Sequence, residues 1–323
     1  MCTGICFKTK CFYFGRNLDV EQTYAEAVTV MPRGYFLKCS NGEAISSHYA
    51  MIGMGTVAHG YPLYYDGVNE HGLSIAALRF AENACYFSPS PSKINVASYE
   101  LIPYLLIKFK TVKEALAILK NLNVTNTAFS KEFPPSPLHW LLADKEESVV
   151  IESVADGLRL YPNEIGVLTN NPPFPFHEQN LCQYLHLTAK EVKNTFSDKV
   201  ELLPFSRGMG AIGLPGDLSS ASRFVRASFT KLNAAKKEDE MTSVTQFFHI
   251  LSSVEQTEGC VEVEGKLEKT AYSACMNCDK GIYYYKTYDN SQITAVALFK
   301  ENLTLSSLKT FPLEKTQKIK YLN

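Results

Sequence analysis

The sequence predicts an α+β fold, in which helices are grouped between runs of antiparallel strands. Strand candidates follow one another closely between residues 138 and 169, with turn residues between them. This spacing leaves no room for crossover helices, so it favours an antiparallel sheet over βαβ units. Amphipathic helices are expected over residues 111–122, 219–232 and 243–254, and they suit layers of helix packed on paired sheets.

The strands are recognised by alternation and by the turns that bound them. Residues 3–7 and 12–16 have the spacing of a β-hairpin, and residues 25–31 alternate with Val28 and Val30 on one side. Turns that contain Asn-Gly, Asp-Gly or Pro separate the other candidates. These candidates are residues 52–58, 73–77, 138–144, 148–153, 158–161, 165–169, 283–288 and 293–299.

Two helices begin with a recognisable cap. Thr111-Val-Lys-Glu114 and Ser243-Val-Thr-Gln246 both have the capping-box pattern, in which the first and last side chains bind free N–H groups of the helix start. Residues 96–108 are expected to be helical as well, starting or breaking near Pro103.

The composition indicates a globular protein with a large core. The chain has 323 residues, of which 46% are hydrophobic, and we expect one domain over residues 1–323. The formal net charge is −1, so neither a nucleic acid nor a membrane surface is an expected partner. No apolar run is long enough to anchor the chain in a bilayer, and no secretion signal is evident at the amino terminus.

Cysteine and histidine spacing gives no sign of a metal site or a disulfide framework. The nine cysteines are an odd number at scattered positions, which fits a reducing cytoplasm. Cys275-Met-Asn-Cys278 is a lone C-x-x-C without a second pair at zinc-site spacing, and the seven histidines show no paired metal spacing. We therefore expect no metal and no cofactor.

The amino terminus has the clearest chemical meaning. A small residue after the initiator Met allows its removal, which would leave Cys2 with both a thiol and a free α-amine. An α-amine titrates near neutral pH, so it can take the thiol proton and leave the nucleophilic thiolate. The predicted hairpin would bring Arg16 and Asp19 close enough to stabilise the thiolate and to orient the amine. On position alone, the alternative is an ordinary cysteine at a frayed terminus.

The opening residues, Met-Cys-Thr-Gly followed by Phe14-Gly-Arg-Asn-Leu-Asp19, resemble the choloylglycine hydrolase family of bile salt hydrolases and penicillin V acylases. These are N-terminal-nucleophile amidases, so the resemblance favours Cys2 as a nucleophile. It also implies an αββα sandwich, two stacked antiparallel sheets flanked by helices. Further segments match in the same order along the whole chain: Asp66-Gly-Val-Asn-Glu-His-Gly-Leu73, Leu138-His-Trp-Leu-Leu-Ala-Asp144, Gly166-Val-Leu-Thr-Asn-Asn-Pro172, Gly213-Leu-Pro-Gly-Asp217, Ser222-Arg-Phe224 and Gly281-Ile-Tyr-Tyr-Tyr285.

The resemblance implies a role for each of five catalytic residues. Arg16 would stabilise the Cys2 thiolate, and Asp19 would anchor the α-amine. Asn170 matches the asparagine whose side-chain N–H faces the developing oxyanion. Arg223 matches the second active-site arginine of the family. The alternatives are a surface ion pair for the first two, a turn residue before proline for Asn170, and a solvent-facing helix position for Arg223.

Two arginines are candidates for substrate binding. Arg79 stands where bile salt hydrolases usually have Asn and penicillin V acylases Tyr, and the family uses the backbone N–H of this position as the second oxyanion donor. Its side chain would pair with the acidic leaving group or point to solvent. Arg207 lies in Ser206-Arg207-Gly208, a type of sequence that in related bile salt hydrolases goes with a preference for glycine conjugates. Its alternative is a solvated side chain.

The prediction is therefore a cofactor-free hydrolase of conjugated bile salts, in which Cys2 attacks the amide that joins a steroid acid to glycine or taurine. The segments around residues 18–24 and 129–138 are expected to wall an apolar pocket. By resemblance, the protein would be a homotetramer, and its cysteine usage indicates the cytoplasm. Two alternatives stay open: a penicillin V or other N-acyl amidase with the same catalytic set, and a catalytically silent binder of bile acids or acyl chains.

Overall fold

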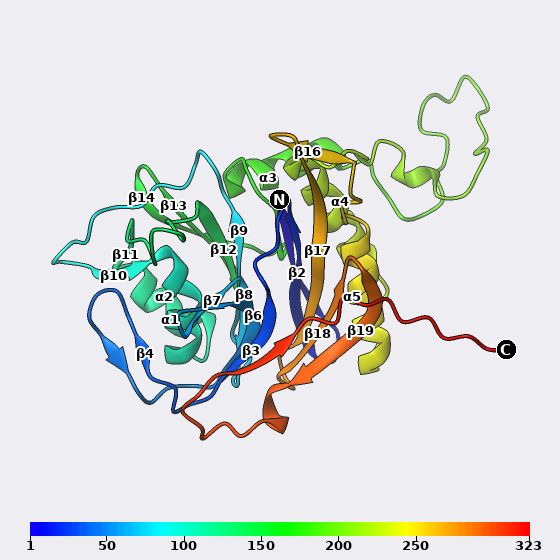
Figure 1. Cartoon of the computed structure of the whole chain (residues 1–323). Helices are drawn as coiled ribbons and strands as arrows, with labels where there is room; N and C mark the ends of the chain where they lie inside the picture. Colours follow the sequence, from blue (N-terminus) through cyan, green and yellow to red (C-terminus); the bar gives the residue numbers. More distant parts are fainter.

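Two antiparallel sheets stack against each other in the computed structural model, which describes residues 1–323 (Figure 1). The first sheet has seven strands in the order β15-β1-β2-β17-β18-β19, with β16 paired to β17. Their bounds are β1 Cys2–Lys8, β2 Phe12–Val20, β15 Val167–Leu168, β16 Val261–Val263, β17 Lys266–Asn277, β18 Ile282–Thr287 and β19 Asn290–Ala297.

The second sheet has nine strands in the order β14-β13-β12-β9-β8-β6-β3-β20, with β7 paired to β6. Their bounds are β3 Ala27–Met31, β6 Met51–Ala58, β7 Tyr61–Tyr64, β8 Asp66–Asn69, β9 Ser74–Arg79, β12 Leu138–Ala143, β13 Ser148–Val154, β14 Gly157–Pro162 and β20 Lys309–Pro312. Two small ribbons complete the β structure, β4 Leu37–Lys38 with β5 Ala44–Ile45 and β10 Ile94–Ala97 with β11 Leu122–Thr125.

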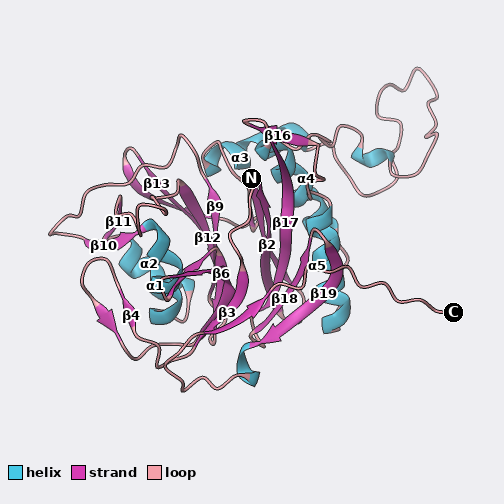
Figure 2. Ribbon diagram, in the orientation of Figure 1, coloured by secondary structure: helices cyan, strands magenta, loops and turns pink.

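Helices cover the outer face of each sheet (Figures 1 and 2). Helices α1 (Leu101–Lys108) and α2 (Val112–Leu119) lie beside the nine-stranded sheet, where α1 packs on β8 and β9. Helices α4 (Ser220–Asn233) and α5 (Glu240–Ser252) lie on the seven-stranded sheet, α4 on β1 and α5 on β17 and β2. The order helix, sheet, sheet, helix confirms the predicted αββα sandwich. The remaining short helices are α3 Phe174–Asn180, η1 Ser98–Glu100, η2 Leu181–Tyr184, η3 Met209–Ala211 and η4 Leu298–Lys300.

The core has two parts because each sheet is covered on both faces. One apolar cluster includes Phe14, Leu78 and Leu141 between the sheets and extends to Phe224 on the buried face of α4. A second cluster lies between the nine-stranded sheet and the helix pair α1–α2 and contains the fully buried Trp140. None of the helices has the length and apolar composition needed to cross a bilayer.

The predicted hairpin at the amino terminus is confirmed as β1 and β2, and it lies in the middle of its sheet. Gly15 is required there because β2 and β17 approach closely. A Cβ on Gly15 would lie 2.0 Å from the carbonyl oxygen of Ala274. The Phe-Gly-Arg sequence thus lets the strand that carries Arg16 pack between two neighbours.

Two predictions about elements need correction, and one element was missed. Helix α5 begins at Glu240 with Asp239 as its cap, not at Ser243, which is buried inside the helix. Residues 94–97 form the strand β10, and Pro103 sits in the first turn of α1, where a missing N–H costs nothing. The long strand β17 was not predicted, although it is central in its sheet.

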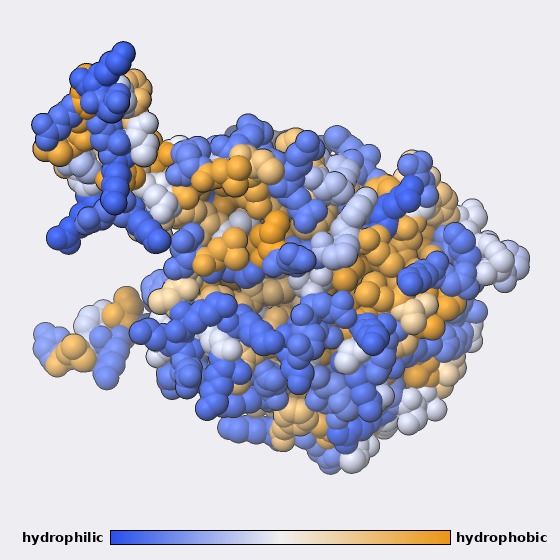
Figure 3. Space-filling view, turned by 180° about the vertical axis from the view of Figure 1, so that it is seen from behind, coloured by the Kyte–Doolittle hydropathy of each residue, from blue (hydrophilic) through white to orange (hydrophobic).

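One loop extends away from the sandwich (Figure 1, upper right). We call residues 188–210 the projecting loop; the N–H of Thr188 donates to the carbonyl of Gly210 and closes its base. Phe196 and Phe205 on this loop are 85% and 84% exposed. Apolar and polar side chains alternate over its surface in the opposite view (Figure 3, upper left).

Candidate active site

Cys2 is the first residue of β1 and is only 4% exposed. In the β1–β2 register, Cys2 faces Leu18 and Gly4 faces Arg16. Opposite residues of an antiparallel pair share a face of the sheet, and alternate residues lie on opposite faces. The side chains of Cys2 and Arg16 therefore point toward the other sheet, whereas those of Thr3 and Asp19 point toward α4 and α5.

Arg16 contacts the sulfur of Cys2 directly. Its Nη2 donates to Cys2 Sγ at 2.6 Å, and its Nη1 donates to the carbonyl of Tyr65 at 3.2 Å and to that of Ala77. The side chain is fully buried. Burial works against the charged form, but neighbouring negative charges, of which Cys2 is the largest contributor, outweigh it and raise the pKa of Arg16. A fixed positive charge thus lies against the thiol.

Arg223 binds the backbone next to the thiol and the side chain of Asn170. Its Nη1 donates to the carbonyl of Cys2 at 2.5 Å and to Thr3 Oγ1 at 2.7 Å, and its Nη2 donates to Asn170 Oδ1 at 2.7 Å. The guanidinium is fully buried, so the solvent-facing alternative for Arg223 is wrong. Helix α4, capped by Ser219, delivers it to this position.

Asp19 is also fully buried and has one free oxygen. Its Oδ1 accepts from Thr270 Oγ1 at 2.6 Å, whereas Oδ2 has no hydrogen-bond partner and lies 4.0 Å from Arg223 Nη1. Burial raises the pKa of Asp19, and the positive charges of Arg223 and the amino terminus oppose that rise. The α-ammonium of Met1 binds the carbonyl of Asp19 at 2.6 Å and Glu268 Oε2 at 2.8 Å.

Asn170 follows β15 and connects the nucleophile to the end of β9. Its Oδ1 accepts from the backbone N–H of Cys2 at 2.9 Å, and its Nδ2 donates to the carbonyl of Arg79 at 2.7 Å. The second N–H of the Asn170 amide has no partner among the protein groups. One donor is therefore free beside Cys2.

The backbone of Arg79 points toward the same side. Arg79 faces Leu138 in the β9–β12 pair, and the next N–H along β9, that of Phe80, donates to the carbonyl of Pro137. Hydrogen-bonded and non-hydrogen-bonded pairs alternate in antiparallel sheets, so the N–H and C=O of Arg79 both point away from β12. Its carbonyl meets Asn170 there. The side chain of Arg79 is exposed.

The structure brings Cys2, Arg16, Asp19, Asn170 and Arg223 together in one buried network, with the backbone of Arg79 beside it. Arg207 is not part of that network. It lies on the exposed projecting loop, and its side chain makes no hydrogen bond or ion pair. The sequence did not indicate Thr270 and Glu268, because β17, which carries both, has no recognisable strand pattern.

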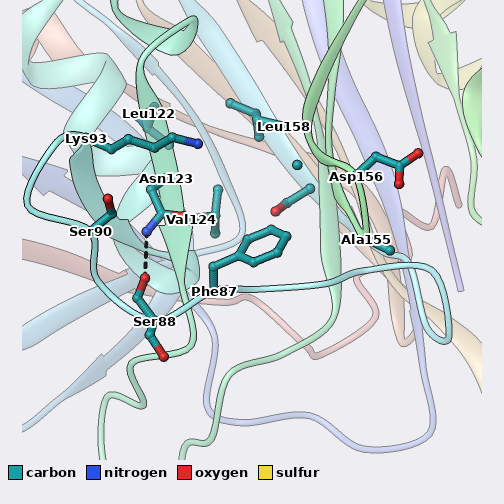
Figure 4. A pocket seen from close by; sticks show the side chains of 12 residues that line it. Phe87, Ser88, Ser90, Lys93, Leu122, Asn123, Val124, Ala155, Asp156 and Leu158 are labelled. Atoms are coloured by element: carbon teal, nitrogen blue, oxygen red, sulfur yellow. Dashed lines mark hydrogen bonds between the residues drawn. The ribbon is translucent and has the colours of Figure 1, made fainter.

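Two surface hollows lie away from this network. One, of about 380 Å³, is bounded by Phe87, Lys93, Asn123 and Asp156 between β11 and the β13–β14 hairpin (Figure 4). The other, of about 520 Å³, lies near Cys6 at the far end of β1. Neither includes Cys2. No three His, Cys, Asp or Glu side chains are grouped as metal ligands would be.

The family of the chain follows from its match to a model described as linear amide C–N hydrolases, choloylglycine hydrolase family, over residues 2–311. This chain belongs to the choloylglycine hydrolase family. The buried Cys2–Arg16 contact at its amino terminus fits a family of N-terminal-nucleophile amide hydrolases.

Relatives in this family match the chain over nearly all or all of their length. The bile salt hydrolase/transferase of Lactiplantibacillus plantarum is 52% identical over 314 residues, which cover 97% of each chain. The bile salt hydrolase/transferase of Clostridium perfringens is 38% identical over 100% of both chains.

Solved structures of the family superpose on the same sandwich. A mutant of the conjugated bile acid hydrolase of Clostridium perfringens superposes with a TM-score of 0.93 at 36% identity, covering 100% of both chains. A penicillin V acylase from Agrobacterium tumefaciens superposes with a TM-score of 0.77 at 20% identity, over 96% of this chain and 90% of the other, and it shares the fold.

Proposed function

We propose that the protein hydrolyses the amide bond of glycine- or taurine-conjugated bile salts, with Cys2 as the nucleophile. The observation that carries the proposal is the 2.6 Å contact between Arg16 Nη2 and Cys2 Sγ, deep in the molecule. The guanidinium places a positive charge beside the sulfur, where it can pair with the thiolate, the nucleophilic form. Relatives named for hydrolysis of bile salts match the chain end to end, and this supports the choice of substrate.

Removal of Met1 would complete the catalytic group. In the chain that retains Met1, the nitrogen of Cys2 is an amide and cannot act as a base. Once Met1 is removed, the nitrogen becomes an α-amine, 2.9 Å from the acceptor Asn170 Oδ1. The unpartnered Oδ2 of Asp19 is a second acceptor for the same ammonium. Buried polar atoms are rarely left without a partner, and this favours Asp19 as the anchor of the amine.

The reaction then proceeds in two balanced steps. The Cys2 thiolate attacks the amide carbonyl carbon, while the free N–H of Asn170 and the backbone N–H of Arg79 bind the oxyanion. The C–N bond breaks as the Cys2 ammonium gives its proton to the departing amine. The α-amine next takes a proton from water, whose oxygen attacks the thioester, so that the C–S bond breaks and the free bile acid and the Cys2 thiolate are released. Arg223 holds Asn170 in place throughout.

Substrate binding is assigned to one aromatic cluster and two arginines. Phe129 lies in a cluster of aromatic rings, 5.4 Å from Tyr61 and 5.3 Å from Tyr99 by ring centroids, and such a cluster suits a steroid. Arg79, exposed at the end of β9, and Arg207 are the proposed cations for the acidic leaving group. A planar carboxylate fits a guanidinium better than a sulfonate does, so glycine conjugates are the preferred substrates.

The assembly belongs to the proposal as well. The whole chain would act as one domain in a cytoplasmic homotetramer. The exposed apolar side chains of the projecting loop support an oligomer, because a neighbouring subunit would remove them from water. Arg207 lies on this loop, so its side chain would reach the catalytic centre of a neighbouring subunit across the interface.

Hydrolysis of glycocholate, taurocholate and penicillin V by the parent protein tests this function. We expect cleavage of both bile salts, and a loss of about 10³-fold or more in the Cys2→Ala variant, as for other removed nucleophiles. The exposed Cys182 provides a matched control, and Cys182→Ala should keep parental rates. Cleavage of penicillin V alone would reassign the substrate, and no cleavage of any of the three would contradict the proposal.

A further inference from the structure

Two buried imidazoles bind consecutive carbonyls at the oxyanion asparagine. His139 Nε2 lies 2.9 Å from the carbonyl oxygen of Thr169, and His177 Nε2 lies 2.9 Å from that of Asn170. A carbonyl oxygen only accepts hydrogen bonds, so each Nε2 carries a hydrogen. Both backbone carbonyls of this short segment are therefore held by side chains from other elements, β12 and α3.

Each imidazole is stacked on a phenylalanine next to a residue of the catalytic network. Phe80, which follows Arg79, stacks on His139 with centroids 4.3 Å apart and planes 5° apart. Phe224, which follows Arg223, stacks on His177 at 4.8 Å and 24°. Both histidines are fully buried, so their rings have little freedom to rotate.

Glu152 connects the two imidazoles. Its Oε1 lies 3.1 Å from His139 Nδ1 and accepts the backbone N–H of Phe174 at 3.0 Å. Phe174 is the first residue of α3, which also carries His177. Glu152 is fully buried, and one shared proton joins it to His139, because the Nε2 hydrogen of that ring is already used. The Glu152 carboxylate thus contacts the His139 ring directly and binds the first residue of α3, the helix that carries His177.

We propose that His139, His177 and Glu152 are positioning residues that fix the Thr169–Asn170 backbone, so that the free amide N–H of Asn170 stays aimed at the oxyanion. This inference rests on the proposed role of Asn170. None of the three reaches substrate, because all are fully buried. Burial also lowers the pKa of His177, so the ring remains a neutral donor at neutral pH. Their effect is expected on kcat more than on KM, since the oxyanion forms only during the reaction.

A pair of variants separates positioning from simple packing. His177→Gln keeps an N–H at the end of the side chain, whereas His177→Met fills a similar volume without a donor. We expect kcat for glycocholate to fall about 10- to 100-fold in His177→Met, less than the full loss of an oxyanion donor, with KM within about twofold. His177→Gln should recover most of the rate. Equal losses in the two variants, or a change confined to KM, would overturn the proposal.

Glu152→Gln is the second variant and is nearly isosteric. The new amide oxygen can accept the N–H of Phe174 and the Nδ1–H of His139. His139 would then carry hydrogens on both nitrogens, a buried positive charge that no carboxylate balances. We expect kcat to fall about 10-fold with KM within about twofold. If thermal unfolding shows that His177→Met does not fold, Glu152→Gln becomes the test of the inference. A parental kcat in Glu152→Gln would contradict it.

A readout that needs no bile salt distinguishes this inference from the proposed function. p-Nitrophenyl acetate acylates the Cys2 thiolate: an S–C bond forms at the ester carbonyl, the C–O bond breaks and p-nitrophenolate leaves, so this step uses the oxyanion site. Alkylation by iodoacetamide displaces iodide and uses no such site. At the Cys2 peptide, we expect His177→Met to slow acetylation about 10-fold relative to His177→Gln, with an unchanged rate of alkylation. Equal acetylation rates would overturn the inference, even if bile salts are not the substrate.

Discussion

At Cys2, two arginines act on different atoms of the same residue. Arg16 contacts the sulfur, and Arg223 contacts the carbonyl and, through Asn170, the nitrogen side. Both are fully buried, and each donates to oxygen atoms that fix its position. A guanidinium has five donors in a rigid fork, and an ammonium has three around one point. The two arginines therefore cannot be exchanged for lysine without loss of geometry.

Arg16→Lys tests whether Cys2 requires a guanidinium beside its sulfur. The ammonium cannot bind the carbonyls of Tyr65 and Ala77 and the sulfur of Cys2 together, so the thiolate loses its partner. We expect alkylation of Cys2 by iodoacetamide at neutral pH to slow about 10-fold, roughly the 1.4 kcal/mol of one weakened charged contact. Arg33→Lys, at a surface ion pair with Glu70, is the matched control and should leave alkylation unchanged. A parental rate in Arg16→Lys would show that the guanidinium does not stabilise the thiolate.

At the scale of elements, the start of α4 positions Arg223. Asp217 lies just before the helix, where its Oδ1 accepts from Ser219 N–H at 2.9 Å and its Oδ2 from Ser222 Oγ at 2.5 Å. These hydrogen bonds from Ser219 and Ser222 lower the pKa of Asp217 from 3.8 to about 2. Negative charge is also favoured at a helix amino terminus.

The pH dependence of this contribution has a defined sign. A carboxylate whose pKa is lowered on folding adds stability above its unfolded pKa, and that stability is lost as the pH falls through the folded pKa. We expect Asp217→Asn to lower the unfolding temperature by about 1–2 °C at pH 6, a small effect because the group is exposed. The difference should disappear as the pH approaches 2. The exposed Asp198→Asn is the control, and a pH-independent difference in Asp217→Asn would refute the assignment.

Elements with strong local signals were predictable, and those defined by tertiary contacts were not. The β1–β2 hairpin and α4 follow from alternation, apolar spacing and caps. Strand β17 begins with a polar half that is partly exposed and ends with a half that is fully buried. No single alternation of polar and apolar residues therefore marks the strand. Ser243 has a capping pattern, but Asp239 accepts the N–H of Thr242 and starts α5 earlier.

The proposed catalytic network shows the same division. Cys2, Arg16, Asp19, Asn170 and Arg223 were predicted because their sequence contexts resemble those of a family. Nothing in the sequence indicated the imidazole contacts to the Thr169–Asn170 carbonyls, because β12, β13 and α3 meet only in the folded chain. An isolated histidine in an apolar strand has no local pattern that distinguishes a positioning residue from a packed one.

At the scale of the whole molecule, the projecting loop exposes the apolar side chains of Phe196 and Phe205 to solvent in the single chain. We expect Phe196→Asp with Phe205→Asp to shift the protein to a smaller species in analytical ultracentrifugation, because charge at an apolar contact opposes association. If Arg207 reads the leaving group across the interface, the glycocholate to taurocholate ratio of kcat/KM should also fall in these variants and in Arg207→Ala.

Arg79→Ala is the comparison for that ratio, because Arg79 stays at the end of β9 whatever the oligomeric state. A parental sedimentation coefficient in the double Phe variant would remove the projecting loop from the interface. A taurine preference in the parent, or an unchanged ratio in both arginine variants, would show that neither arginine selects the conjugate.

The mass of the amino-terminal peptide after rapid acid quenching during glycocholate turnover tests whether Cys2, freed of Met1, is the nucleophile. Acid preserves the thioester between turnover steps, so the peptide reports the nucleophile and the state of the amino terminus together. We expect a cholyl group on Cys2 in a peptide that lacks Met1, and no such adduct in Cys2→Ala. An adduct on another cysteine, or on a peptide that retains Met1, would contradict it.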